Sequence, residues 1–176
     1  MILKLKQTPG IYLIGFMASG KTTIGRLLAS RLGWHFADID EDIEAAAQRT
    51  IPEIFDTAGE AAFRGMESEA IAKRVRAVAC GRPAVVAVGG GAAAQPGNLE
   101  LLEEHGVTIW LSCPYHVVAR RVAQNSHRPL ARDMQRLEHL FHTRQQAYER
   151  AGFRIEIESD DPAVAVEAIM NLPLFQ

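Results

Sequence analysis

The residues best suited to chemistry form a glycine-rich loop near the start of the chain. An apolar run, Ile11–Ile14, leads into Gly15-Phe16-Met17-Ala18-Ser19-Gly20-Lys21-Thr22, and a helical pattern of apolar residues follows. A strand, a Gly-x-x-x-x-Gly-Lys-Thr loop and a helix together are typical of a polyphosphate site. Gly15 and Gly20 permit close backbone approach, and the free N–H groups of the helix end attract anions. The loop therefore predicts a nucleoside triphosphate site, with Lys21 on the β- and γ-phosphates and the Thr22 hydroxyl on Mg²⁺.

Two carboxylates, Asp38 and Asp40, follow the next strand-like segment. A carboxylate near Thr22 would hold Mg²⁺ through water, because Mg²⁺ keeps several waters and takes few protein ligands. A second carboxylate would accept a hydrogen bond from a substrate hydroxyl and orient it toward the γ-phosphate. The alternative is an acidic helix start that the helix dipole favours. We prefer that alternative for Glu41 and Asp42, and the chemical interpretation for Asp38 and Asp40.

Three further features carry weaker signals. Gly89-Gly90-Gly91 follows a buried apolar run and indicates close backbone approach to another group, although a tight turn would use the same residues. Arg64 and Arg144 lie in helical patterns, where spacing alone favours ordinary solvated arginines. Arg128 lies in an aperiodic segment, where an arginine would close over phosphates, and a plain surface loop fits equally well.

The elements needed to position these residues alternate along the chain. Strand-like runs cover Ile11–Ile14, Trp34–Ala37, Ala84–Val88, Val107–Leu111 and Ile155–Glu158. Helical patterns cover Lys21–Leu32, Glu41–Arg49, Pro52–Asp56, Glu60–Ala79, Asn98–His105, a segment after Pro114, Met134–Arg150 and Pro162–Leu172. This alternation predicts an α/β fold, an open parallel sheet of about five strands with helices on both faces. Ligands bind beyond the carboxyl ends of such strands, where both the phosphate loop and the triple glycine fall.

Composition limits the classes of partner. The 176 residues fit one domain, residues 1–176, with a sizeable core, and the net charge of −2 implies no general attraction to nucleic acid or anionic membranes. Cys80 and Cys113 have no metal-binding or redox spacing, which fits a reducing compartment. The N-terminal residues lack the apolar region of a signal peptide, and no segment approaches the roughly 20 apolar residues of a membrane span. We expect a cytoplasmic monomer with a small-molecule substrate.

The motifs, taken in order, resemble the shikimate kinase family. The matching set is Gly15–Thr22, Asp38-Ile39-Asp40, the run Ile54-Phe55…Gly59-Glu60…Phe63-Arg64…Glu67, Val88–Gly91, Arg128-Pro129-Leu130 and Arg144…Tyr148. The resemblance implies a three-layer P-loop kinase fold like that of nucleoside monophosphate kinases, with a substrate-binding helical segment near 41–80 and a lid near 125–136. It also implies ATP-dependent phosphorylation of the 3-hydroxyl of shikimate, giving shikimate 3-phosphate and ADP, in aromatic amino acid biosynthesis.

By position, the resemblance assigns a role to each matching residue. The implied catalytic residues are Lys21, Asp40 and Arg128. The implied ATP-binding residues are Gly15, Ala18, Ser19, Gly20, Lys21, Thr22, Thr23, Arg121 and Arg128. The implied shikimate-binding residues are Asp40, Arg64, Gly89, Gly90, Gly91 and Arg144, and the implied Mg²⁺ ligands are Thr22 and, through water, Asp38.

Two departures from the family pattern affect the nucleotide side. Ala18 stands where the family usually has a glycine, and a methyl group there is tolerable only if the backbone keeps φ below zero, because a side chain disfavours the left-handed region. Asp160 and Asp161 stand where some relatives carry an adenine-stacking arginine, so the contacts to the base are left open. Two other functions remain alternatives: a related kinase acting on a substrate such as gluconate, and a non-catalytic ligand-sensing module on the same fold.

Overall fold

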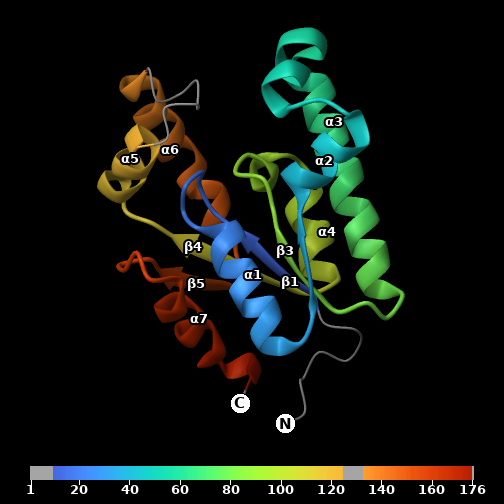
Figure 1. Ribbon diagram of the computed structural model, residues 1–176, viewed down its shortest axis with the longest axis vertical. Helices are drawn as coiled ribbons and strands as arrows, with labels where there is room; N and C mark the ends of the chain where they lie inside the picture. Colours follow the sequence, from blue (N-terminus) through green and yellow to red (C-terminus); the bar gives the residue numbers. More distant parts are fainter. Residues whose placement is uncertain (1–9, 125–132, 176) are drawn as a thin grey trace.

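A five-stranded parallel sheet forms the centre of the part of the chain that the computed structural model describes, residues 10–124 and 133–175. The strands are β1 (Gly10–Ile14), β2 (His35–Asp38), β3 (Ala84–Ala87), β4 (Val107–Ser112) and β5 (Phe153–Glu156). Their order across the sheet is β2-β3-β1-β4-β5, and every neighbouring pair is parallel (Figure 1). The carboxyl ends of all five strands therefore lie at one edge of the sheet.

Helices cover both faces of this sheet. They are α1 (Lys21–Leu32), α2 (Ile39–Ala47), α3 (Ile51–Ala79), α4 (Asn98–Glu104), α5 (Tyr115–Gln124), α6 (Met134–Tyr148) and α7 (Pro162–Met170), with 3₁₀ turns η1 (Ala92–Ala94) and η3 (Pro173–Phe175). Helices α1 and α7 pack together on one face, while α4 packs on β4 from the other face and contacts α3 (Figure 1). The expected three-layer α/β/α arrangement is confirmed.

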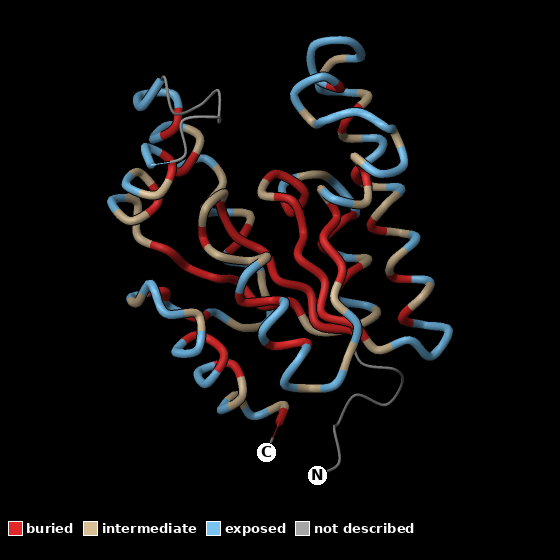
Figure 2. Tube along the Cα trace, in the orientation of Figure 1, coloured by how far each residue is buried: buried red, intermediate tan, exposed pale blue. Residues whose placement is uncertain are grey.

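The central strands are apolar along their whole length because both faces of the sheet are covered. Every residue of β1 and β3 is buried, and the strands form the continuous buried centre of Figure 2. Gly25 of α1 allows that helix to approach closely, since a Cβ atom there would lie 3.2 Å from the Leu13 side chain. The sheet and α1 thus form a rigid base for the loops at the strand ends.

Helix α3 joins two segments that the sequence pattern separates. Thr50 and Glu53 form a capping box at its start, in which the Thr50 N–H donates to a Glu53 carboxylate oxygen (2.7 Å). The helix is interrupted at Gly59, whose backbone angles (φ 83°, ψ 171°) are not helical. Gly59 therefore divides α3 into two helical segments, so the separate patterns expected over 52–56 and 60–79 are confirmed, and glycine adopts the angles between them without a side-chain clash.

The segment 125–132 lies outside the described residues. It contains Arg128 and most of the lid expected near 125–136, so both stay predictions. After it, the Asp133 carboxylate caps α6 by accepting a hydrogen bond from the Arg136 N–H (2.9 Å). Within residues 10–124 and 133–175, no helix is long and apolar enough to cross a membrane.

Candidate active site

A cavity of about 680 Å³ opens at the carboxyl edge of the sheet. The phosphate loop and the start of α1 form one wall, and Asp38, Asp40 and Gly90 lie at one end. At the other end, α5 contributes Arg121 and the segment before α7 contributes Asp160. Most of the residues that the sequence assigns to nucleotide binding therefore surround one space.

The phosphate loop is shaped by its backbone. Gly15 (φ 144°) and Gly20 (φ 96°) adopt angles that favour glycine, and a Cβ atom on Gly15 would lie 2.8 Å from the Leu111 carbonyl oxygen. The Lys21 ammonium donates to the carbonyls of Gly15 and Phe16 (2.9 Å each), which places its charge over the loop. Helix α1 begins at Lys21, and its first residues line the cavity. Its first turn holds no acidic residue, so no carboxylate there reduces the positive charge of the helix end. This geometry suits a polyphosphate.

The backbone of Ala18 does not meet the condition set by its methyl group. Its φ is +61°, in the left-handed region, rather than below zero. Ala18 is the third residue of a turn in which the Ser19 N–H donates to the Phe16 carbonyl (3.2 Å), and this is the position at which a type II turn requires a positive φ. The loop thus keeps a glycine-like shape at a cost of about 1 kcal/mol for the methyl group.

Thr22 and Asp38 meet where a metal ion bound to a triphosphate would lie. The Thr22 hydroxyl donates to one Asp38 carboxylate oxygen (2.6 Å), and the other oxygen accepts from the Asp40 N–H (3.0 Å), which caps α2. Mg²⁺ prefers oxygen ligands and takes few of them from the protein. A hydroxyl beside a carboxylate matches this preference. The two residues that the sequence assigns to Mg²⁺ are therefore adjacent, and their chemistry fits the ion.

Asp40 occupies a position that favours a strong hydrogen-bond acceptor. Burial and then the neighbouring Asp38 raise the pKa of Asp40 to about 6, while Lys21 lowers it. The group is mostly ionised at neutral pH and more basic than an exposed aspartate. A carboxylate with a pKa near the working pH is suited to accept a proton from a substrate hydroxyl.

Arg64 is not an ordinary solvated arginine. Its side chain is only 15% exposed, and its guanidinium donates to the carboxylate of the buried Glu67 (2.8 Å). The Arg64 Nε atom is buried and has no hydrogen-bond partner among the described residues, so it is a donor available for an anion. Glu67 has no role among the residues assigned from the sequence, although its spacing of three residues from Arg64 on one helix indicates the pair.

The triple glycine lies against these side chains. A Cβ atom on Gly91 would lie 2.5 Å from Nη2 of Arg64, and one on Gly89 would collide with the Glu67 carboxylate. A Cβ atom on Gly90 would lie 3.5 Å from Nη1 of Arg144. None of the three has a positive φ, so close approach rather than a special turn explains them. The interpretation as a site of close backbone approach is confirmed.

Arg144 of α6 reaches the same glycine segment. Its guanidinium carbon lies 5.7 Å from the centre of the Phe16 ring, and burial lowers the pKa of Arg144, with a further contribution from the nearby Arg64 charge. Tyr148, one turn later, donates its hydroxyl to the Gly90 carbonyl. Two arginines thus approach one short backbone segment, beside the cavity rather than in its wall, and guanidinium groups placed in this way are suited to bind a carboxylate.

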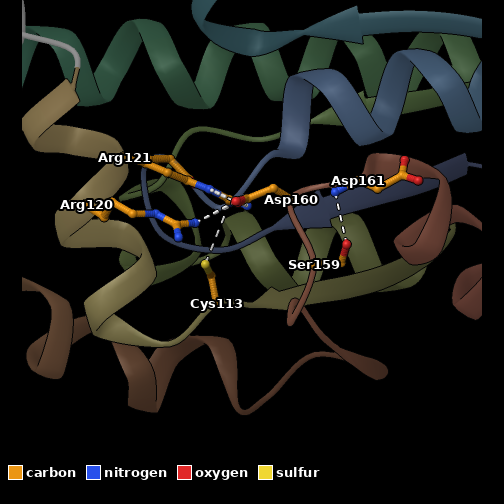
Figure 3. Close-up of polar contacts among 7 residues, drawn as sticks. Cys113, Arg120, Arg121, Ser159, Asp160 and Asp161 are labelled. Atoms are coloured by element: carbon orange, nitrogen blue, oxygen red, sulfur yellow. Dashed lines mark hydrogen bonds and ion pairs between the residues drawn. The ribbon is translucent and has the colours of Figure 1, made fainter.

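Arg121 lies at the opposite end of the cavity. It donates to the Ala18 carbonyl (3.0 Å) and to Asp160 (Figure 3). Thr23, also assigned to the nucleotide, is exposed, whereas the loop residue Ser19 is fully buried, and both line the cavity. The described residues contain no group of three or more His, Cys, Asp or Glu side chains that would hold a metal ion by themselves.

A parallel sheet that carries a phosphate loop and an adjacent Thr22–Asp38 pair, with two arginines beside the cavity, is the arrangement of a P-loop kinase of small metabolites. The family model described as shikimate kinase matches residues 17–172. The chain belongs to the shikimate kinase family.

Individual relatives agree with this assignment. The shikimate kinase of Persephonella marina is 37% identical over 92% of this chain and 96% of its own length. The shikimate kinase of Thermosynechococcus vestitus is 41% identical over 90% of this chain and 87% of its own length. The solved structure of shikimate kinase from Acinetobacter baumannii in complex with shikimate is 35% identical, with a TM-score of 0.87 over 97% of this chain and 95% of that one.

Proposed function

We propose that this protein transfers the γ-phosphoryl group of ATP to the 3-hydroxyl of shikimate, giving shikimate 3-phosphate and ADP. The observation that carries the proposal is the position of Asp40. It lines the cavity with the phosphate loop, and its carboxylate would lie 3.1 Å from a Cβ atom on Gly89, at the start of the glycine segment that Arg64 and Arg144 approach. A hydroxyl presented to Asp40 would thus lie between a carboxylate-binding site and the γ-phosphate. The relative from Acinetobacter baumannii, solved with shikimate, supports the choice of acceptor.

On the nucleotide side, the backbone from Gly15 to Thr23 and the Lys21 ammonium would hold the phosphates. Thr22 and Asp38 would hold Mg²⁺, which when bound neutralises charge on the phosphates. Arg121 would lie near the base, and Arg128 would cover the phosphates from the lid.

On the acceptor side, Arg64 and Arg144 would bind the shikimate carboxylate, and the backbone of Gly89, Gly90 and Gly91 would line the pocket. Asp40 would accept the proton of the attacking hydroxyl as its oxygen bonds to the γ-phosphorus and the bond from that phosphorus to ADP breaks. The residues contribute chiefly position and charge, which phosphoryl transfer requires most.

Release of ADP tests the proposal. The purified protein with ATP and Mg²⁺ should release ADP when shikimate is added, and much less with quinate or gluconate. Turnover with gluconate but not shikimate would favour the related kinase. Shikimate binding without release of ADP would favour the ligand-sensing module.

The carboxylate site is tested separately with Arg144→Ala. Removing a buried charged donor costs about 2–5 kcal/mol, so the KM for shikimate should rise at least about thirtyfold while the KM for ATP stays the same. Arg150→Ala is the matched control, because Arg150 follows the same helix but is exposed and paired with Glu100. An unchanged shikimate affinity in Arg144→Ala would contradict the assignment.

A further inference from the structure

We propose that Asp160 is a positioning residue for the nucleotide: its carboxylate fixes the Arg121 guanidinium against the Ala18 carbonyl and so holds the phosphate loop in its binding shape. The inference rests on the proposed function, because it concerns the same nucleotide site. It makes use of an acidic residue whose role the sequence leaves open.

Asp160 joins two elements that both line the cavity, α5 and the segment before α7 (Figure 3). It lies between β5 and α7, and it accepts hydrogen bonds from two adjacent arginines of α5. Nη2 of Arg120 lies 2.7 Å from one of its oxygens, and Nη2 of Arg121 lies 2.7 Å from the other. The Arg121 side chain is 21% exposed and that of Arg120 is 52% exposed, so Arg121 is the inner partner.

Arg121 uses two separate parts of its guanidinium. Nε and Nη2 donate to Asp160 (3.3 and 2.7 Å), and Nη1 donates to the Ala18 carbonyl (3.0 Å), with the Cys113 sulfur 3.8 Å away. The N–H bonds of a guanidinium lie in its plane, so two sets of acceptors fix both the position and the orientation of that plane. Without Asp160, the orientation of the guanidinium would depend on the contacts of Nη1 alone.

Ala18 needs such support. A non-glycine residue in the left-handed region is strained and persists only where its surroundings determine its conformation. The hydrogen bond from Arg121 acts on the carbonyl of that residue, from an element far away in the sequence. A carboxylate that holds Arg121 in place therefore stabilises the loop at its most strained residue.

The charges are consistent with a supporting role. Arg120 and Arg121 are adjacent, and Asp160 lies between their guanidinium groups and reduces their mutual repulsion. Two cations around one carboxylate leave the group positive, so it does not repel a triphosphate in the same cavity. The neighbouring Asp161 behaves differently: its carboxylate accepts from the Ala163 N–H (2.9 Å) and caps α7.

The experiment compares Asp160→Asn with Asp161→Asn by titration calorimetry with ADP, which requires no turnover. An exposed ion pair contributes little, so the Kd for ADP should rise only about threefold to fivefold in Asp160→Asn. Asparagine caps helices as well as aspartate does, so Asp161→Asn should leave the Kd unchanged. The Kd for shikimate should be the same in both variants.

A double-mutant cycle tests whether Asp160 acts through Arg121. In an Arg121→Ala background, Asp160→Asn should have no further effect on ADP binding. An undiminished effect there, unchanged or tighter ADP binding in Asp160→Asn alone, or equal losses for ADP and shikimate would overturn the proposal. Failure of the proposed function would instead appear as absence of shikimate-dependent ADP release in the unaltered protein.

Discussion

The two ends of the active site are built by different means. The nucleotide end is made mainly from consecutive residues, and backbone angles, loop carbonyls and the end of α1 shape it. The acceptor end is assembled from side chains of α2, α3 and α6 around the glycine segment that follows β3. One end depends on local conformation, and the other depends on tertiary packing.

The electrostatics differ in the same way. At the acceptor end, burial raises the pKa of Asp40 and of Glu67 and lowers the pKa of Arg144. Burial disfavours the charged form of each of these three groups, and groups with such shifted pKa values are typical of functional sites. At the nucleotide end the unfavourable feature is a backbone angle, that of Ala18. Substitutions at the acceptor end should therefore change turnover or the KM for shikimate, and substitutions at the nucleotide end should change ADP affinity or the free energy of unfolding.

The largest effect is expected for Asp40→Asn. Losing the proton acceptor should lower kcat by about 10²–10⁴. Because the folded-state pKa is raised from 3.8 to about 6, the ionised carboxylate destabilises the folded protein at neutral pH by about 3 kcal/mol, and a neutral amide removes this penalty. Turnover assays and thermal unfolding should show an inactive variant with a higher Tm. Near-normal turnover would remove Asp40 from the mechanism.

Gly91→Ala should damage the acceptor end alone. The new methyl group would lie 2.5 Å from the end of the flexible Arg64 side chain, which moves more easily than backbone. We expect the KM for shikimate to rise about tenfold to a hundredfold, with the affinity for ADP unchanged. Gly65→Ala is the control, because Gly65 is an exposed residue of α3 with open space at its Cβ position, and alanine there should stabilise the helix by about 0.5–1 kcal/mol. Equal effects of the two substitutions on KM would contradict the packing argument.

The pH dependence of kcat/KM for shikimate should differ from that of ADP binding. The proton acceptor must be ionised, so kcat/KM for shikimate should fall about tenfold for each pH unit below about 6. Above that pH the profile should be flat, until other groups titrate. A pH series of initial rates, beside ADP titrations at the same pH values, measures the difference. A profile flat down to pH 5 would show that the raised pKa of Asp40 does not govern the reaction.

The smallest effect is expected for Ala18→Gly. Glycine adopts φ +61° without strain, so the substitution should raise the free energy of unfolding by about 0.5–1 kcal/mol despite the greater freedom of the unfolded chain. Chemical denaturation measures this change, and the KM for shikimate should not move. A destabilised variant would mean that the alanine methyl group makes favourable contacts that outweigh its backbone strain.

The same contrast explains what could be predicted from the sequence. The start and end of α1 follow from local patterns, and the pairing of Thr22 with Asp38 follows from the meeting of strand ends. The condition that Ala18 keep φ below zero is not met, because it considers the preference of a single residue without the turn that contains it.

Tertiary contacts were the harder part. The helical pattern favoured a solvated Arg64: spacing on one helix indicates its pair with Glu67, but nothing local shows that Gly91 lies against it. The hydrogen bond from Tyr148 to Gly90 and the ion pairs from Asp160 to α5 join residues far apart in the sequence, and no periodicity indicates them. The lid and the role of Arg128 stay predictions.

The kinked helix α3 has a consequence for how such enzymes diversify. Asp40, Arg64 and Glu67 all lie on the single connection between β2 and β3, which pair with each other in the sheet. Replacing that one continuous stretch would change most of the acceptor chemistry while β1, the phosphate loop and α1 kept their registers. Evolution, or an engineer, can therefore exchange the substrate without rebuilding the part of the molecule that handles the phosphate donor.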